Sequence, residues 1–277
     1  MRLLRQGKVK DIYDLDDGNI LFQFSDRVSA FDVKMSTAIP RKGEVLCKFG
    51  KFWFDSLGTA HHMLGVKDKD KMIVKRLEML PVECVVRGYF YGSFVERYRN
   101  FLGSNLPGDY SPILAGKLPS PIFDPTTKSE EHDTPVSRRE VTRSKILSGE
   151  DYDYLESIST SLYIKMSEIA EKAGFIIADV KFEFGRDEKG EIILGDSLGP
   201  DEFRLWLKKE YSPGKAQESY DKQLLRDWLI RTGFKENVDN LARNGKKPPP
   251  PEIDPPIVAE LSRRYIVAYE QITGNKL

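Results

Sequence analysis

The sequence predicts an α+β fold with antiparallel sheets and C-terminal helices. Segments typical of strands crowd the first 75 residues and return as a hairpin near residues 176–196, while helical patterns lie between and after them. Because strands and helices do not alternate strictly, this order argues against a doubly wound parallel sheet. At 277 residues the chain exceeds one minimal core, so one large domain or two closely joined domains are expected.

The N-terminal elements follow from local patterns. Asp11–Tyr13 and Asn19–Phe24 are apolar runs of strand type on either side of an Asp17-Gly18 turn. Apolar residues recur at steps of three and four over 46–64, which predicts a buried helix face. Residues 71–77 and 82–86 are expected to form further strands.

The second half of the chain is expected to hold more helix. Segment 104–135 is rich in Pro, Gly, Ser and Asp, which predicts a long surface loop. Loops of this length in compact domains often have a function. Helices are expected over 151–173, ending at Gly174, and over 215–232, ending at Gly233. The Pro-rich stretch 248–256 predicts an extended strap before a last helix. That helix is expected to bury Val258, Leu261, Tyr265, Ile266 and Tyr269.

The segment 176–196 carries a cluster of charge on one predicted hairpin. Its period-two alternation places Asp179, Lys181 and Glu183 on one face of the first strand. With a turn centred on Lys189-Gly190, Glu183 would lie opposite Asp196, where two carboxylates repel unless a cation separates them. One or two carboxylates with substrate phosphates are a common Mg²⁺ site. A solvated strand face, or a register slipped by a different turn, is the alternative.

Composition excludes several classes of partner. Lys plus Arg equals Asp plus Glu at 43 each, so no overall charge favours a nucleic-acid polymer or an anionic membrane. The two cysteines, Cys47 and Cys84, show neither metal-site nor disulfide-framework spacing. No apolar run approaches the length of a membrane span, and the first residues lack a secretory signal. A cytoplasmic protein is therefore expected, and a homo-oligomer is left open.

Common catalytic motifs are missing from the sequence. It contains no P-loop, no G-x-G-x-x-G fingerprint and no H-E-x-x-H pair. Residues 195–198 spell the Gly-Asp-Ser-Leu block of a serine hydrolase family, but no histidine follows His132 to act as its base. We reject the hydrolase reading for that reason.

Other polar segments are better candidates for binding anions. In Gly7–Asp11, a glycine allows close approach and Lys8 and Lys10 offer charges for phosphate, although a plain surface turn has the same composition. An apolar strand is expected to end at Arg87, shortly before Ser93, and an arginine with a hydroxyl group suits a phosphate. A core strand that simply ends in a surface arginine is the alternative. Asp201 and Arg204 follow the proposed metal site, and the polar stretch 126–133 suits a closing flap or a solvated loop.

Seven blocks in the same order resemble the SAICAR synthetase (phosphoribosylaminoimidazole-succinocarboxamide synthase) family. They are GKVKDIY (7–13), SDRVSAFD (25–32), LPVECVVRGYFYGS (80–93), TTKSEEHD (126–133), ADVKFEFG (178–185), LGDSLGPDEFRLW (194–206) and QESYDKQLLRDWL (217–229). The resemblance spans nearly the whole chain. It implies an ATP-dependent ligase of purine biosynthesis that joins L-aspartate to the carboxylate of 5-amino-1-(5-phosphoribosyl)imidazole-4-carboxylate, giving ADP, phosphate and the succinocarboxamide.

The resemblance also implies a fold and a set of site residues. The fold would have two β-rich lobes clasping ATP, as in kinases and ATP-grasp enzymes, with an N-terminal lobe over 1–78 and a larger lobe over 79–277. By position in the motifs, Lys8 and Lys10 would bind ATP phosphates, and Glu183 and Asp196 would hold Mg²⁺. The ribose phosphate of the nucleotide would be bound by Arg87, Ser93 and Arg204. Among the catalytic residues, Asp201 would face the aminoimidazole, with Asp179 and Lys181 beside the reacting groups. The residues expected around aspartate and the closing loop are Asp32, Lys128, His132 and Asp133.

The chain departs from the family pattern at four positions without losing a residue that this chemistry needs. Tyr91 and Phe203 stand where small or hydroxyl residues are usual, Leu207 where an acid often follows Trp, and Ser197 where an acid is expected after Asp196. The last difference puts a third metal carboxylate in doubt.

Overall fold

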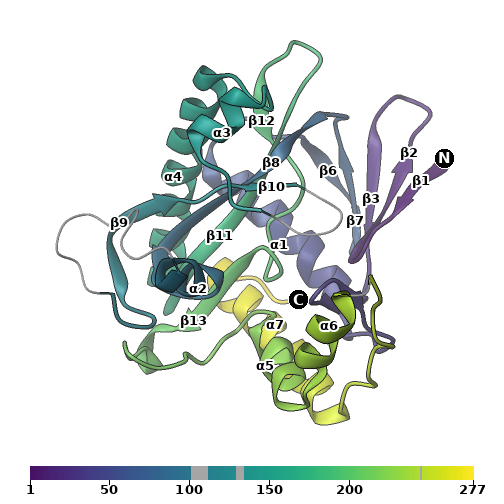
Figure 1. Ribbon diagram of the computed structural model, residues 1–277. Coiled ribbons are helices and arrows are strands. Elements are labelled where there is room, and N and C mark those ends of the chain that lie inside the picture. Colours follow the sequence, from purple (N-terminus) through teal and green to yellow (C-terminus); the bar gives the residue numbers. More distant parts are fainter. Residues whose placement is uncertain (101–111, 129–133, 244) are drawn as a thin grey trace.

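The computed structural model describes residues 1–100, 112–128, 134–243 and 245–277. The N-terminal strand patterns form a five-stranded antiparallel sheet in the order β1-β2-β3-β7-β6 (Figure 1). Its strands are β1 (Arg2–Gln6), β2 (Lys10–Asp14), β3 (Ile20–Phe24), β6 (Met63–Asp68) and β7 (Lys71–Val74). A two-stranded ribbon, β4 (Ser29–Ala30) and β5 (Val33–Lys34), follows β3.

The second sheet is built around the alternating strand that carries the charge cluster. That strand is β11 (Phe175–Arg186), which pairs antiparallel with β8 (Glu78–Tyr89) on one side and with β12 (Ile192–Leu194) and β13 (Phe203–Leu207) on the other. The strands β9 (Lys117–Phe123) and β10 (Thr126–Thr127) pair with β8. The prediction of an α+β fold with antiparallel sheets is therefore confirmed.

Helices join and cover the two sheets. The helix α1 (Lys42–Leu57) contacts β3 and β6 of the first sheet as well as α4 (Gly149–Lys172) and α7 (Pro255–Thr273), and it crosses between the sheets in Figure 1. The helix α4 packs on β8, β9 and β11, and thereby leaves the opposite face of the second sheet for the charged side chains. The remaining helices are α2 (Ser93–Asn100), α3 (Arg138–Arg143), α5 (Gln223–Arg231), α6 (Phe234–Ala242) and a short 3₁₀ turn at Lys208–Glu210.

One hydrophobic core runs through both sheets. It includes Phe24 from β3, Phe49 and Trp53 from α1, and Phe182 from β11, all at most 2% exposed. Burial of this apolar surface is the main force that holds the sheets together. The predicted boundary at residues 78 and 79 stays a prediction; the chain leaves the first sheet at Val74 and enters the second at Glu78.

Several expected boundaries were wrong. The helix predicted over 46–64 ends at Leu57, because Gly58 takes a left-handed conformation and His61 then pairs with β12. The predicted loop 104–135 contains β9 and β10, and the helix predicted from residue 215 begins at Gln223.

The C-terminal half also bears out part of the prediction. The helix expected over 151–173 is α4, followed by the left-handed Gly174. In α7, Leu261, Tyr265 and Tyr269 are buried as expected, whereas Val258 and Ile266 are only partly buried. Among the described residues, no helix is both long and apolar enough to cross a membrane.

Candidate active site

The charged face of β11 begins with an arginine–aspartate–arginine row. Asp179 pairs across the sheet with Arg87 of β8 on one side and with Arg204 of β13 on the other. The carboxylate of Asp179 accepts a hydrogen bond from Arg204 and lies 3.5 Å from the guanidinium of Arg87. Arg87 also donates to Ser93 at 3.3 Å, so three residues predicted to bind phosphate are brought together.

Further along the same face a lysine lies between two acids, which reverses the charges of the arginine–aspartate–arginine row. Glu183 lies opposite Glu83 of β8, and the ammonium group of Lys181 bridges them at 2.9 Å and 2.7 Å. Together these acids raise the pKa of Lys181 well above its usual value, although burial alone would lower it. Lys181 is therefore a permanent cation between two carboxylates.

The predicted pairing of Glu183 with Asp196 was wrong by one residue. The hairpin pairs Phe184 with Leu194, which places Glu183 opposite Gly195. Asp196 lies just beyond the strand with a left-handed backbone, and its carboxyl group still comes within hydrogen-bonding reach of Glu183. The two carboxylates thus meet, although by a bend in the chain and not by strand pairing.

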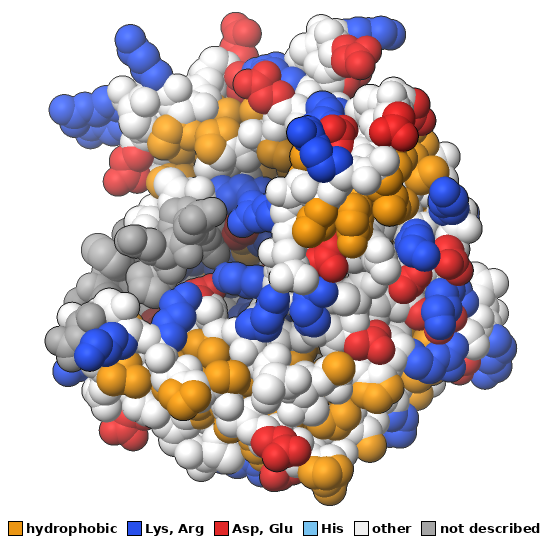
Figure 2. Space-filling view, turned by 90° about the vertical axis from the view of Figure 1, so that its right-hand side faces the viewer, with side chains coloured by type: hydrophobic (Ala, Val, Ile, Leu, Met, Phe, Trp, Pro, Cys, Tyr) orange, Lys and Arg blue, Asp and Glu red, His pale blue; other side chains and the backbone are white. Residues whose placement is uncertain are grey.

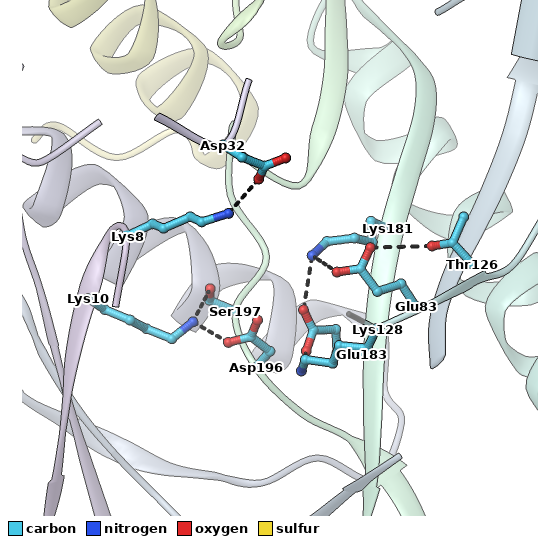
Figure 3. Close-up of polar contacts among 10 residues, drawn as sticks. All are labelled: Lys8, Lys10, Asp32, Glu83, Thr126, Lys128, Lys181, Glu183, Asp196 and Ser197. Atoms are coloured by element: carbon cyan, nitrogen blue, oxygen red, sulfur yellow. Dashed lines mark hydrogen bonds and ion pairs between the residues drawn. The ribbon is translucent and has the colours of Figure 1, made fainter. Parts of the chain in front are cut away.

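One lysine of the first sheet, Lys10 at the start of β2, faces this carboxylate pair (Figure 3). Lys10 forms an ion pair with Asp196 and donates to the Ser197 hydroxyl at 3.2 Å. Burial works to raise the pKa of Asp196, but Lys10 and Lys181 hold it at about 2. Lys8 pairs instead with Asp32 at 2.6 Å, outside this cluster.

Lys128 is the last of the predicted residues that the structure describes in this region. The ammonium group of Lys128 pairs with Glu183, so this residue reaches the charged face from just after β10. His132 and Asp133 lie outside the described residues.

A cavity of about 540 Å³ opens over the arginine–aspartate row. Figure 2 shows a hollow on one face of the molecule with Lys and Arg side chains along its edge. Among the residues predicted from the sequence, the lining includes Arg87, Ser93, Asp179, Lys181, Asp201 and Arg204. The lysine and carboxylate pairs around Asp196 lie beside the cavity, and Lys181 joins the two regions through its bond to Glu183.

Asp201 is held by more partners than its motif suggested. Its carboxylate lies 2.8 Å from the ammonium group of Lys42 and accepts a hydrogen bond from the Tyr265 hydroxyl at 2.8 Å. Lys222 lies 3.8 Å away. Burial opposes ionisation here, but Lys222 and Lys42 lower the pKa of Asp201. The neighbouring Glu202 also lines the cavity, and burial together with Asp201 and Asp196 raises its pKa to about 8.

Sequence reasoning missed several charged residues of the cavity. Arg97 shares the Asp124 carboxylate with Arg87, and it lies one helical turn beyond Ser93 in α2. Lys222 and Arg226 both line the cavity from the start of α5. Their four-residue spacing within the last of the seven sequence blocks was the signal that could have found them, since such a pair faces one side of a helix.

The carboxylates present suit a divalent cation. In the described part of the chain no group of three acids, histidines or cysteines could enclose a metal ion by itself. Glu183 and Asp196 supply two adjacent carboxylates, and Mg²⁺ is often held by that number together with substrate phosphates. The residues therefore fit an ion that is shared with a nucleotide.

Comparison with known proteins finds, over most of the chain, the family that the motifs resemble. Residues 3–241 match the family described as SAICAR synthetase. The phosphoribosylaminoimidazole-succinocarboxamide synthase of Nitrosopumilus maritimus is 50% identical over 278 residues and covers 100% of both chains, and that of Candida maltosa is 38% identical over 99% of this chain and 95% of its own.

Solved structures agree. The SAICAR synthase of Saccharomyces cerevisiae complexed with SAICAR superposes with a TM-score of 0.84 at 34% identity, covering 99% of this chain and 95% of that chain. A SAICAR synthetase in complex with ADP gives a TM-score of 0.73 at 27% identity, over 99% and 98% of the two chains. The resemblance drawn from the motifs is confirmed, and the chain belongs to the SAICAR synthetase family of ATP-dependent carbon–nitrogen ligases in de novo purine biosynthesis.

Proposed function

We propose that the cavity binds the carboxyaminoimidazole nucleotide and L-aspartate, and that the carboxylate pair beside it holds Mg²⁺ with ATP. The observation that carries this proposal is the order of charge along β11, where two arginines flank Asp179 and two glutamates flank Lys181. Such a face can meet a phosphate at one end and a metal-bound nucleotide at the other.

The reaction needs an activated carboxylate. A carboxylate is a poor acyl group, so transfer of the γ-phosphoryl group of ATP gives it a leaving group that the aspartate amine can displace. Bound Mg²⁺ would neutralise charge on the phosphates during this transfer. The chain's own contribution is positioning and charge, because phosphoryl transfer requires little covalent chemistry from the protein.

Individual residues take the following roles in the proposal. Lys8 and Lys10 bind ATP phosphates, and Glu183 and Asp196 hold the metal. Arg87, Ser93 and Arg204 bind the nucleotide's phosphate. Asp179, Lys181 and Asp201 lie beside the reacting groups, while Asp32, Lys128, His132 and Asp133 belong to the aspartate site or the closing loop.

Aspartate needs cations of its own because it brings two carboxylates, and we assign Lys222 and Arg226 to them. Burial lowers the pKa of Arg226, and the neighbouring Arg204 lowers it further. The oxygens of the nearby Asp221 accept the backbone N–H groups of Leu205 and Gln223, each at 2.6 Å, and among the described residues no carboxylate lies within 4 Å of Arg226. An anionic ligand would supply the missing negative charge.

The location and assembly of the protein remain proposals as well. Cys47 and Cys84 are both buried free thiols, which supports the expected reducing compartment, the cytoplasm. A homo-oligomer stays open.

The decisive experiment mixes the protein with ATP, Mg²⁺, aspartate and the carboxyaminoimidazole nucleotide. We expect ADP release that depends on all four components, with the succinocarboxamide detected by mass spectrometry. A nucleotide-binding regulator of the same fold would bind Mg·ATP without turnover. A small-molecule kinase would give a stable phosphorylated product without aspartate. Folded protein that forms no amide would refute the proposal.

A further inference from the structure

Asp196 has a backbone conformation that needs outside support. Its φ of 56° is left-handed, which is unfavourable for a residue other than glycine. Such conformations persist only where the surroundings determine them strongly, and they are frequent at functional sites. The preceding peptide is fixed, because the Gly195 N–H donates to the carbonyl of Glu183 at 2.8 Å.

The carbonyl of Asp196 is held by a histidine of the first half of the chain. Nε2 of His62 lies 2.9 Å from this carbonyl oxygen. A carbonyl oxygen only accepts, so Nε2 must carry the proton. His62 is 2% exposed, and its ring packs edge-on against Phe22 and Phe54 at 5.6 Å and 5.5 Å between ring centres. The donor therefore has little freedom to turn away.

The main chain on either side is also fixed. The N–H of His62 donates to the carbonyl of Leu194 at 3.0 Å, and the N–H of Leu194 donates to the carbonyl of Ala60 at 3.0 Å. The carbonyl of His62 accepts from the N–H of Lys75 at 2.7 Å, just after β7. His62 thus directly precedes β6 of the first sheet and reaches the end of β12 in the second.

The first sheet also binds the side chain of Asp196, through Lys10 of β2. Lys10 pairs with the Asp196 carboxylate, and its ammonium group lies 4.9 Å from the centre of the Phe22 ring. Phe22 therefore contacts both groups that bind Asp196. With its carbonyl fixed by His62, Asp196 has its carboxylate directed toward Glu183 and Lys10.

We propose that His62 is a positioning residue that sets the direction of the Asp196 carboxylate for Mg²⁺ by donating a hydrogen bond to the Asp196 carbonyl. This inference rests on the proposed role of Asp196 as a metal ligand. Outer partners that orient metal ligands contribute about 10- to 100-fold to metal affinity. The first sheet would then control metal affinity through one side chain that touches neither metal nor substrate.

The test measures Mn²⁺ affinity of the protein–ADP complex by electron paramagnetic resonance, and thermal stability without metal. In H62F the ring contacts are kept and the donor is lost, and we expect Mn²⁺ affinity to fall about 10- to 100-fold. In H62Q the amide N–H can replace Nε2–H, so affinity should stay near that of the wild type. The matched control is H61F, because the neighbouring His61 packs on Phe54 at 5.0 Å and its ring does not bond to Asp196; its affinity should not change.

The variant D196N serves as the reference for the metal site. If D196N weakens Mn²⁺ binding while H62F behaves like H61F, the positioning role is wrong and the metal site stands. If D196N binds Mn²⁺ normally, the metal assignment and the inference both fail. Should H62F not fold, nitrogen NMR of the wild-type imidazole decides: an Nε2–H tautomer supports the inference, and an Nδ1–H tautomer overturns it.

Discussion

The proposed role of Arg204 can be tested by substituting Gly92, which lies against the Arg204 guanidinium. Gly92 has a φ of 64°, and an added Cβ would lie 2.6 Å, 2.7 Å and 2.8 Å from Nη2, Cζ and Nη1 of Arg204. Ordinary contact begins at 3.4 Å. In Gly92→Ala the guanidinium must therefore move by several tenths of an ångström, away from a position where it also bonds to Asp179.

Two separate effects are expected in this variant. A side chain at left-handed φ costs about 1–2 kcal/mol of folding free energy. Displacing Arg204 would in addition cost a charge-assisted hydrogen bond to the nucleotide, about 1.5–3 kcal/mol. The second effect corresponds to a rise of roughly ten- to hundred-fold in KM for the carboxyaminoimidazole nucleotide.

Gly58 provides a strain-matched control. It has a φ of 61° at the end of α1, and nothing lies within 4 Å of its added Cβ. Both alanine variants should lower Tm, by roughly 2–4 °C for each kcal/mol lost. Only Gly92→Ala should raise the KM for the nucleotide, measured in steady-state assays at saturating ATP and aspartate. A nucleotide KM in Gly92→Ala that matches that of Gly58→Ala would refute the assignment of Arg204.

Three further predictions concern the other groups of the site. Arg87→Ala should raise the KM for the nucleotide about ten- to hundred-fold and that for ATP far less, while Lys8→Ala should do the reverse or lower kcat; equal effects of Arg87→Ala on both would contradict its role. Glu183→Gln and Asp196→Asn should each lose catalysis while circular dichroism shows an intact fold. Near-normal activity of both variants at low Mg²⁺ would contradict the assignment of these two carboxylates as metal ligands. Burial lowers the pKa of Lys222 to about 8, so its charge, and with it kcat/KM for aspartate, should fall above that pH. The variant Lys222→Arg stays charged, so its kcat/KM for aspartate should not fall at alkaline pH. If the fall persists in this variant, it is caused by another group.

The arrangement of charged residues at the candidate site was largely predictable from the sequence, because one strand carries three of them. Alternation placed Asp179, Lys181 and Glu183 on one face, and the motifs identified Arg87 and Arg204, which the sheet brings beside Asp179. These predictions depend only on the two-residue period of a strand and on the order of motifs. They do not depend on the exact length of any turn.

The register failed because the hairpin turn is one residue longer than assumed. Asp187 bonds to Glu191 through its backbone, which leaves a three-residue loop with Gly190 at φ 80°. Three-residue loops with a left-handed glycine are common in hairpins, and the sequence fits this loop as well as the two-residue turn. A slip of one residue moves every pairing partner in the hairpin, so Glu183 lies opposite Gly195 in place of Asp196.

Contacts between distant segments were beyond local patterns. Lys10 and Asp196 are 186 residues apart in the chain, and His62 and Asp196 are 134 apart. Neither Lys10 nor His62 carries a local pattern that names its partner. The end of α1 shows the same limit, because the apolar spacing continues past Gly58 into His61 and Leu64, which belong to extended chain.

The order of charges has a consequence for how ligands bind. Asp179 pairs with both Arg87 and Arg204, and Asp124 supplies a second carboxylate to Arg87. Glu83 and Glu183 pair with Lys181, so these cations already have partners in the protein alone. Buried charges without partners would be costly, and this pairing allows the site to fold before its ligands arrive. On the proposed assignment, a substrate phosphate would share Arg87 and Arg204 with Asp179, and its affinity would reflect an exchange of partners. Lys222 and Arg226 are less closely paired, since among the described residues the nearest carboxylate lies 3.8 Å from Lys222 and none lies within 4 Å of Arg226. An anion added at that end gains more from each cation, which is the physical reason to place aspartate beside α5.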